Sequence, residues 1–172
     1  MKLIEASYEI LPSHGHTLPD IYKDIERAGR VCYKSENKTT EDSAEPFVKM
    51  IIERGHTAVL EQGTVYLYLP YVHYNARVIK YQTNPYSKVN YNSNVVINKE
   101  GEKECLPLAY GYAGYYITTN YRVIMQNHWE EDLEYLCKPC KYHSKRVSVR
   151  FICSRAIANE LVRHRTINKL VA

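Results

Sequence analysis

Two short segments in which apolar and polar side chains strictly alternate do most to limit the fold of this chain. In Thr64–Leu69 a valine and two leucines occupy alternate positions, and in Val147–Phe151 two valines and a phenylalanine do the same. Successive side chains of a strand point to opposite faces, so this pattern predicts strands with one packed face and one solvated face. Such strands are typical of antiparallel sheets, and Pro70 closes the first of them.

Helical spacing of apolar residues predicts helices beside these strands. One is expected over residues 20–33, with Asp20 as its N-cap, and one over 43–54, begun by Ser43 and ended by the glycine that follows it. A third helix is expected from about Ser154, directly after the second strand. The sequence therefore predicts an α+β fold in which helices pack on an antiparallel sheet.

The long section 71–146 separates the two strands. It holds 12 of the 17 tyrosines, and so many large rings indicate packing rather than a flexible linker. A further helix is expected in it around residues 129–137. Because 172 residues suit one domain, we expect residues 1–172 to form a single domain.

Composition and charge limit the class of protein. Hydrophobic residues make up 45% and charged residues 24% of the chain, which is close to the average of folded soluble proteins. No segment resembles a signal peptide or a membrane span, and an odd set of five cysteines suits free thiols, so a cytoplasmic location is expected. The net charge of +4 is uneven, because residues 141–172 hold eight Lys or Arg and one acid (+7) and leave −3 for the rest. An anionic ligand is therefore expected near that segment.

The triplet Arg163-His164-Arg165 is a candidate anion site. Adjacent residues on a helix are about 100° apart, so the two arginines would point in different directions and serve two different anions. The alternative is structural, because cations in the last turn of a helix complement its dipole. The triplet by itself leaves both interpretations open.

Two other segments have a functional and a structural interpretation each. In Gly55–Gln62, His56 and Glu61 would lie near one another across a short helical turn, although helix-terminal histidines and solvated glutamates are common. Basic residues among the tyrosines of 74–91 would suit a stacking surface for single-stranded nucleic acid, whereas ordinary aromatic packing is the alternative.

Cys137 and Cys140 have C-x-x-C spacing. With His143, or with His128, they are candidate ligands of a zinc site, and the same spacing occurs in redox pairs. A tetrahedral zinc site needs four ligands, and no second C-x-x-C accompanies the first. Coincidence is the alternative.

Longer stretches, and their order along the chain, resemble a known family. Gly55–Gln62 reads G-H-T-A-V-L-E-Q and precedes a strand, and Val149–Arg165 reads V-R-F-I-C-S-R-A-I-A-N-E-L-V-R-H-R. Both stretches resemble motifs of the flavin-dependent thymidylate synthases (the ThyX family), and Ala28–Ser35 with Thr40–Ala44 does as well. The resemblance covers residues 1 to about 69 and 147–165.

The resemblance implies a fold, cofactors and site residues. It implies an α+β fold of the thymidylate synthase-complementing type and a homotetramer with FAD bound between subunits. The family transfers a methylene group from methylenetetrahydrofolate to dUMP and uses NADPH to reduce the flavin. By position, His56 would approach the flavin, Glu160 and Arg163 would hold dUMP, and Arg163, His164 and Arg165 would contact FAD. The implied partners are small molecules and other subunits, neither nucleic acid nor a membrane.

The sequence also departs from the family. Ala58, Gln62 and Asn159 replace residues that are usual there, and 71–146 is an insertion absent from short members. In the family signature seven residues follow the second arginine and a serine comes next, which would be position 173 here, so the chain is expected to be truncated at its C-terminus relative to the family. The first hypothesis is a thymidylate synthase-like enzyme. The alternatives are a non-catalytic remnant or oligomerising relative that keeps the scaffold and, more distantly, a nucleic-acid-binding or zinc-binding module.

Overall fold

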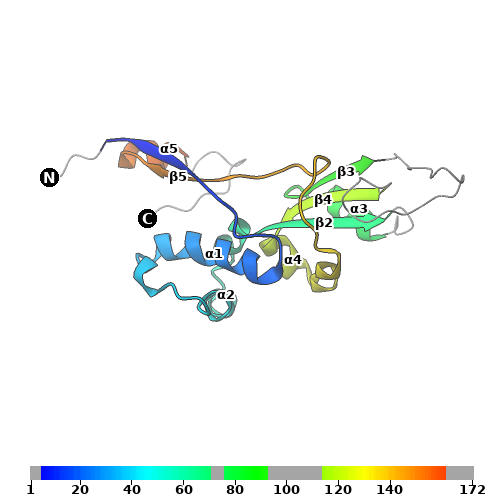
Figure 1. Ribbon diagram of the computed structural model, residues 1–172, viewed down its shortest axis with the longest axis horizontal. Helices are drawn as coiled ribbons and strands as arrows, with labels where there is room; N and C mark the ends of the chain where they lie inside the picture. The colour runs from blue at the N-terminus through cyan, green and yellow to red at the C-terminus, as the bar shows by residue number, and fades with distance from the viewer. Residues whose placement is uncertain (1–4, 71–75, 93–113, 162–172) are drawn as a thin grey trace, which may run out of the picture. The chain divides into compact units, whose positions relative to one another are not determined.

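The computed structural model describes residues 5–70, 76–92 and 114–161, which form a mixed α+β structure with two small antiparallel sheets (Figure 1). The predicted α+β class is therefore confirmed. Its contacts divide the chain into two compact units, residues 1–63 with 146–172 and residues 64–145. The single domain over residues 1–172 stays a prediction.

The first unit is built on two helices, α1 (Leu18–Cys32) and α2 (Ala44–Glu53), which pack against each other as Figure 1 shows. The short 3-10 helix η1 (Glu36–Lys38) lies between them in the chain, and a second 3-10 helix, η2 (Thr57–Gln62), packs on α1. Both predicted helices are confirmed. Buried apolar side chains of α1, α2 and η2 form the core of the unit, namely Ile21, Ile25, Phe47, Val48, Ile51, Val59 and Leu60.

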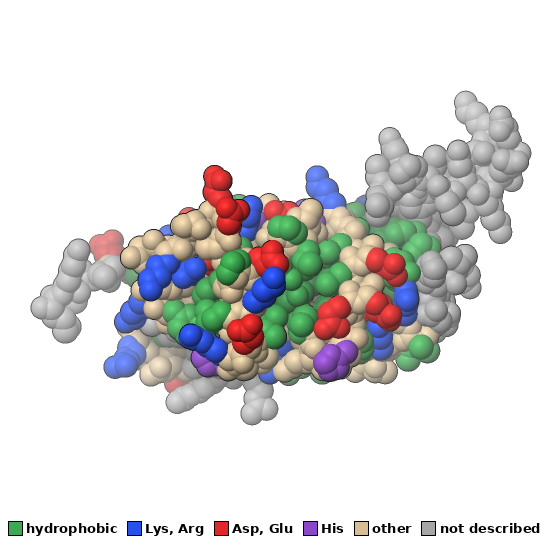
Figure 2. Space-filling view, turned by 90° about the horizontal axis from the view of Figure 1, so that it is seen from below, with side chains coloured by type: hydrophobic (Ala, Val, Ile, Leu, Met, Phe, Trp, Pro, Cys, Tyr) green, Lys and Arg blue, Asp and Glu red, His purple; other side chains and the backbone are tan. Residues whose placement is uncertain are grey.

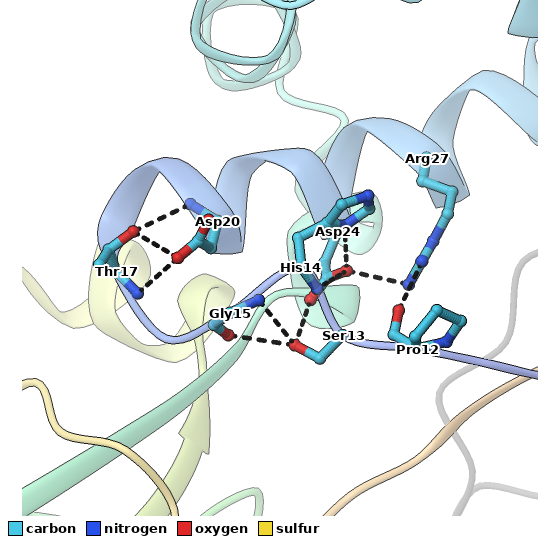
Figure 3. A network of polar contacts seen from close by, with 8 residues as sticks. All are labelled: Pro12, Ser13, His14, Gly15, Thr17, Asp20, Asp24 and Arg27. Carbon is cyan, nitrogen blue, oxygen red and sulfur yellow. Dashed lines mark hydrogen bonds and ion pairs between the residues drawn. The ribbon is translucent and has the colours of Figure 1, made fainter.

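Helix α1 begins with a capping box and not, as predicted, with Asp20 as its N-cap. Thr17 is the N-cap, and its hydroxyl accepts a hydrogen bond from the backbone N–H of Asp20 (3.4 Å) while the Asp20 carboxylate accepts one from the backbone N–H of Thr17 (3.2 Å; Figure 3). The hydrogen bonds from Thr17 hold the pKa of Asp20 below its ordinary value. The prediction missed the cap because Asp20 takes the acidic third position of the box.

The loop before α1 is fixed to the helix by Asp24. Its Oδ1 lies 2.7 Å from Nδ1 of His14 and 2.9 Å from Nη2 of Arg27, and its Oδ2 accepts a hydrogen bond from Ser13 (3.0 Å; Figure 3). Arg27 also donates to the carbonyl of Pro12 at 2.6 Å. One helical carboxylate thus orders the chain that connects the first strand to α1.

The first strand, β1 (Ser7–Leu11), pairs antiparallel with β5 (Ser148–Ile152), and β5 leads into helix α5 (Arg155–Leu161). The predicted strand at 147–151 and the helix after it are confirmed, each within one residue. Tyr8 lies opposite Phe151 and Ile10 lies opposite Val149, so all four share one face of this two-stranded sheet. Much of that face is exposed, with 72% of Tyr8 and 57% of Phe151 accessible.

The second unit contains a three-stranded antiparallel sheet in the order β2 (Thr64–Pro70), β4 (Gly114–Asn120) and β3 (Lys88–Asn92). Helices α3 (Ala76–Thr83) and α4 (Tyr121–Asn127) and the 3-10 helix η4 (Glu130–Tyr135) complete the described part of the unit. The helix expected at 129–137 is this 3-10 helix, and it is shorter than predicted.

Strand β2 is confirmed, but its predicted solvated face is not. Tyr66 is buried and Thr64 and Tyr68 are half-buried, and the whole of β4 is buried between β2 and β3. Tyr68 packs on Tyr116 of β4 with ring centroids 5.2 Å apart. Tyrosine rings therefore pack on the second face of β2, which the alternation of polar and apolar residues had predicted to be solvated.

Candidate functional site

The structure describes part of the predicted flavin and nucleotide site. Arg163, His164 and Arg165 lie outside the described residues. Glu160 lies on α5 and His56 lies between α2 and η2, both with exposed side chains and both in the first compact unit. His56 is the predicted site residue whose surroundings the structure defines best.

The position of His56 follows from the way α2 ends. Gly55 adopts a left-handed conformation (φ 70°), its N–H donates to the carbonyl of Ile52 (3.0 Å), and the N–H of His56 donates to that of Ile51 (3.1 Å). These two bonds form a Schellman motif, which uses a glycine because a side chain disfavours positive φ. The carbonyl of His56 then accepts from Val59 (3.3 Å) and starts η2. The His56 backbone is therefore fixed on both sides.

The His56 ring contacts Tyr33, the residue that ends α1. The Tyr33 hydroxyl is hydrogen-bonded to Nδ1 of His56, and the two rings stack with centroids 6.1 Å apart and planes 19° apart. Phe47 packs against Tyr33 in a T-shaped arrangement with ring centroids 6.3 Å apart. This contact joins Ala28–Ser35 and Gly55–Gln62, two of the segments on which the family resemblance rests.

Arg30 lies close to this pair, but its charge is already matched. Its Nε and Nη2 lie 3.0 and 2.7 Å from one carboxylate oxygen of Glu26, which is buried, and its guanidinium lies 4.8 Å from the centroid of the Phe47 ring. The guanidinium therefore packs on Phe47, which contacts Tyr33, and we assign it a structural role and not that of an anion ligand.

Close packing between α1 and η2 depends on Gly29. A β-carbon at Gly29 would lie 2.7 Å from the ring of Phe47 and 2.9 Å from Val59. Because Gly29 has no side chain, the end of α1 can approach α2 and η2 closely. Tyr33 lies at that end of α1, and His56 lies directly before η2. The packing of the core thus determines the geometry of the pair.

Glu160 is placed by the β5–α5 connection. The Ser154 hydroxyl accepts a hydrogen bond from the backbone N–H of Ile157 (3.4 Å), and its carbonyl accepts from Ala158 (3.0 Å), so Ser154 caps the helix that the sequence predicted from about this residue. None of the described residues of α5 is buried. The Glu160 side chain is consequently on the surface.

The structure brings Cys137, Cys140 and His143 together in the second unit, around a histidine that is fully hydrogen-bonded. The N–H of Cys140 donates to Nδ1 of His143 (3.2 Å), so Nε2 carries the proton and donates to the carbonyl of Leu67 (3.1 Å). Burial lowers the pKa of His143, which keeps the ring neutral. Since both ring nitrogens already have partners, His143 is structural.

The described surroundings of Cys137 fit neither a metal centre nor a reactive thiol. Within the described ranges, no cluster of three or more His, Cys, Asp or Glu side chains has an arrangement that could hold a metal ion. Burial raises the pKa of Cys137 to about 12, so its thiol stays protonated, whereas redox-active cysteines need a thiolate. The zinc-site and redox interpretations of the C-x-x-C spacing therefore have no support among the described residues.

A buried charged cluster that the sequence did not reveal links α3 to η4. Asp132 has 0% of its surface exposed, and its Oδ2 lies 2.6 Å from Nζ of Lys80 and accepts a hydrogen bond from the Tyr81 hydroxyl at 2.7 Å. The Lys80 ammonium also lies 4.8 Å from the centroid of the Trp129 ring. Burial and the bond to Asp132 raise the pKa of Tyr81. Because 51 residues separate Tyr81 from Asp132, no local spacing could have predicted the cluster.

The face drawn in Figure 2 does not show the basic stripe expected of a nucleic-acid-binding surface. On the face drawn in Figure 2, acidic and basic side chains are interspersed with apolar ones. A groove that follows a phosphate backbone would gather lysines and arginines instead.

Comparisons with protein-family models, with curated proteins and with solved structures gave no match. The resemblance to the flavin-dependent thymidylate synthases consequently rests on the residues of the motifs themselves. Across residues 5–70, 76–92 and 114–161, no helix has the length and apolar character needed to cross a lipid bilayer.

Proposed function

We propose that this chain is a flavin-dependent thymidylate synthase-like protein, which converts dUMP to dTMP with methylenetetrahydrofolate, FAD and NADPH. The observation that carries the proposal is the grouping of the family-like segments. Residues 28–44, 55–62 and 149–161 are distant in the sequence but belong to one compact unit. The bond between Tyr33 and His56 joins the first two of these segments directly. Their grouping supports a common site.

The His56 ring fits a flavin contact. It is exposed, and in the described part of the chain its Nε2 has no hydrogen-bond partner, so this atom is available to a ligand. The flavin, when bound, would take a hydride from NADPH and deliver it to the one-carbon unit on the nucleotide. Arg163 and Arg165 would pair with phosphates of dUMP and FAD, because guanidinium groups bind phosphate in a bidentate manner.

We propose a thymidylate synthase-complementing fold, with residues 71–146 as an insertion, a homotetrameric assembly and a cytoplasmic location. The second compact unit, residues 64–145, nearly coincides with the proposed insertion, which supports this division of the chain.

A second candidate is a non-catalytic, oligomerising relative that keeps this scaffold. One observation favours it: the exposed apolar face of the β1–β5 sheet, where Tyr8, Ile10 and Phe151 are 72%, 62% and 57% accessible. Exposed apolar patches commonly mark protein interfaces. This candidate predicts self-association without turnover.

Titration with FAD tests the proposal. The purified chain is titrated with FAD while flavin fluorescence and the visible spectrum are recorded, first alone and then with dUMP. Saturable binding that is tighter in the presence of dUMP is expected. Fluorescence that stays that of free flavin, in a protein with a folded circular dichroism spectrum, would contradict the proposal.

Two matched variants locate the binding site. His56 and His128 are both exposed histidines, and His128 ends α4 in a left-handed conformation that asparagine tolerates. His56→Asn is expected to weaken FAD binding severalfold, whereas His128→Asn is expected to leave it unchanged. Equal effects of the two substitutions would remove His56 from the site.

A further inference from the structure

The contact between Tyr33 and His56 supports an inference beyond the flavin contact itself. We propose that Tyr33 is a positioning residue whose hydroxyl donates to Nδ1 of His56, fixes the tautomer that carries its proton on Nε2, and thereby presents Nε2–H to the ligand. The identity of the ligand as a flavin rests on the proposed function. The state of His56, however, can be measured without any ligand.

The direction of the hydrogen bond follows from the chemistry of the two groups. A phenol is a good donor and a poor acceptor, because its oxygen lone pair is delocalised into the ring, whereas the unprotonated nitrogen of a neutral imidazole is a strong acceptor. The contact from Tyr33 to Nδ1 of His56 is therefore best satisfied as O–H···N. A neutral imidazole that accepts at Nδ1 carries its hydrogen on Nε2.

The surroundings of the pair hold it in this geometry. The N–H of Tyr33 donates to the carbonyl of Gly29 (3.1 Å), and the Tyr33 ring packs against Phe47 in a T-shaped arrangement. The Schellman motif fixes the backbone of His56, and stacking on Tyr33 fixes the plane of its ring. In the described part of the chain, neither the Tyr33 hydroxyl nor the His56 ring has another hydrogen-bond partner. The pair is therefore ordered before a ligand arrives.

The fixed tautomer determines which ligand atom His56 can recognise. A donor at Nε2 suits a carbonyl oxygen or an unprotonated ring nitrogen, and the isoalloxazine ring of a flavin offers both. With the other tautomer the same position would present an acceptor and leave such a ligand atom unpaired, which lowers affinity. Tyr33 would thus act on ligand binding through His56 without touching the ligand.

Nitrogen NMR tests the inference directly. Protein with ¹⁵N-labelled histidine is examined in long-range ¹H–¹⁵N spectra at a pH where imidazoles are neutral, and His56→Asn identifies the His56 signals among the seven histidines. The wild type is expected to show His56 as the Nε2–H tautomer. Tyr33→Phe keeps the ring packing and is expected to give a mixture of tautomers, whereas Tyr8→Phe, at an exposed tyrosine of the same unit, should leave the signals unchanged.

The same variants are then titrated with FAD. Tyr33→Phe is expected to weaken binding by about three- to tenfold, the effect of one lost hydrogen-bond constraint, while Tyr8→Phe binds like the wild type. An Nδ1–H tautomer of His56 in the wild type would overturn the role of Tyr33 whether or not the variant folds. A wild type that shows the Nε2–H tautomer but binds no FAD would instead overturn the proposed function and leave the Tyr33–His56 relation standing.

Discussion

Replacement of Asp132 by alanine is expected to destabilise the second unit strongly. The substitution leaves the Lys80 ammonium without its carboxylate and the buried Tyr81 hydroxyl without its acceptor. Loss of one partner of a buried ion pair costs about 3–5 kcal/mol, and the lower value applies because 19% of the Lys80 side chain can reach water. An unsatisfied buried hydroxyl adds about 1 kcal/mol, so the expected loss is about 4 kcal/mol.

Urea unfolding followed by tryptophan fluorescence measures this loss. Trp129 is the single tryptophan of the chain, and its ring lies 4.9 Å from that of Tyr81, so the signal reports on this cluster. With a denaturant slope of about 2 kcal/mol/M, the midpoint is expected to fall by about 2 M. The neighbouring substitution Glu131→Gln, in a side chain 65% exposed, should leave the midpoint unchanged.

A second substitution tests the cause of the effect. If the unpaired ammonium is responsible, Lys80→Met in the Asp132→Ala background should restore part of the lost stability, because the buried charge is then absent. A midpoint for Asp132→Ala close to that of the wild type would refute the reasoning. It would mean that water or a rearranged side chain replaces the carboxylate at no cost.

Three further outcomes are expected. Gly29→Ala should lower the melting temperature although alanine favours helices, because its β-carbon meets Phe47 at 2.7 Å and overpacking costs about 1–3 kcal/mol; a higher melting temperature would contradict this. Burial lowers the pKa of His143, so the unfolded chain binds a proton at a pH where the folded chain does not, and the free energy of unfolding should fall as the pH drops below 6.5. His143→Gln should remove this part of the pH dependence. A profile of urea midpoint against pH that is the same in the variant and the wild type would contradict the reasoning. Thr17→Ala should cost about 1 kcal/mol by removing the cap that bonds Asp20, which thermal unfolding followed by circular dichroism can measure, with no change as the contrary result.

Local sequence patterns predicted helices α1 and α2 and strands β2 and β5. Helices α1 and α2 and strand β5 each combine a regular apolar period with exposed polar positions, and the predicted bounds agree with the structure within about two residues. Gly55 was correctly expected to end α2, and it does so in the left-handed conformation. These features depend on neighbours in the sequence, and for that reason the sequence alone revealed them.

The tyrosine-rich section was harder to interpret, because its central strand has no solvated face. All seven residues of β4 are buried, so polar and apolar side chains need not alternate. Helix α4, which follows it, was also missed, although Asn120 caps it through a bond to the N–H of Val123 (3.0 Å). Asn120, three residues before the apolar Val123, was the sequence signal that could have predicted the start of α4.

The candidate site was likewise predicted only in part from the sequence. The motif that contains His56 was visible in the sequence, but its partner was not, because 23 residues separate Tyr33 from His56 and the packing of α1, α2 and η2 brings them together. Arg163, His164 and Arg165 remain predictions, since they lie outside the described residues.

Formation of dTMP tests the central claim most directly. The purified chain is incubated with dUMP, methylenetetrahydrofolate labelled in its one-carbon unit, FAD and NADPH, and the nucleotides are separated and identified by mass. The proposed function predicts labelled dTMP that depends on every component and is reduced in His56→Asn but not in His128→Asn. Absence of dTMP from a folded, FAD-bound protein would contradict the enzymatic assignment and favour the non-catalytic relative.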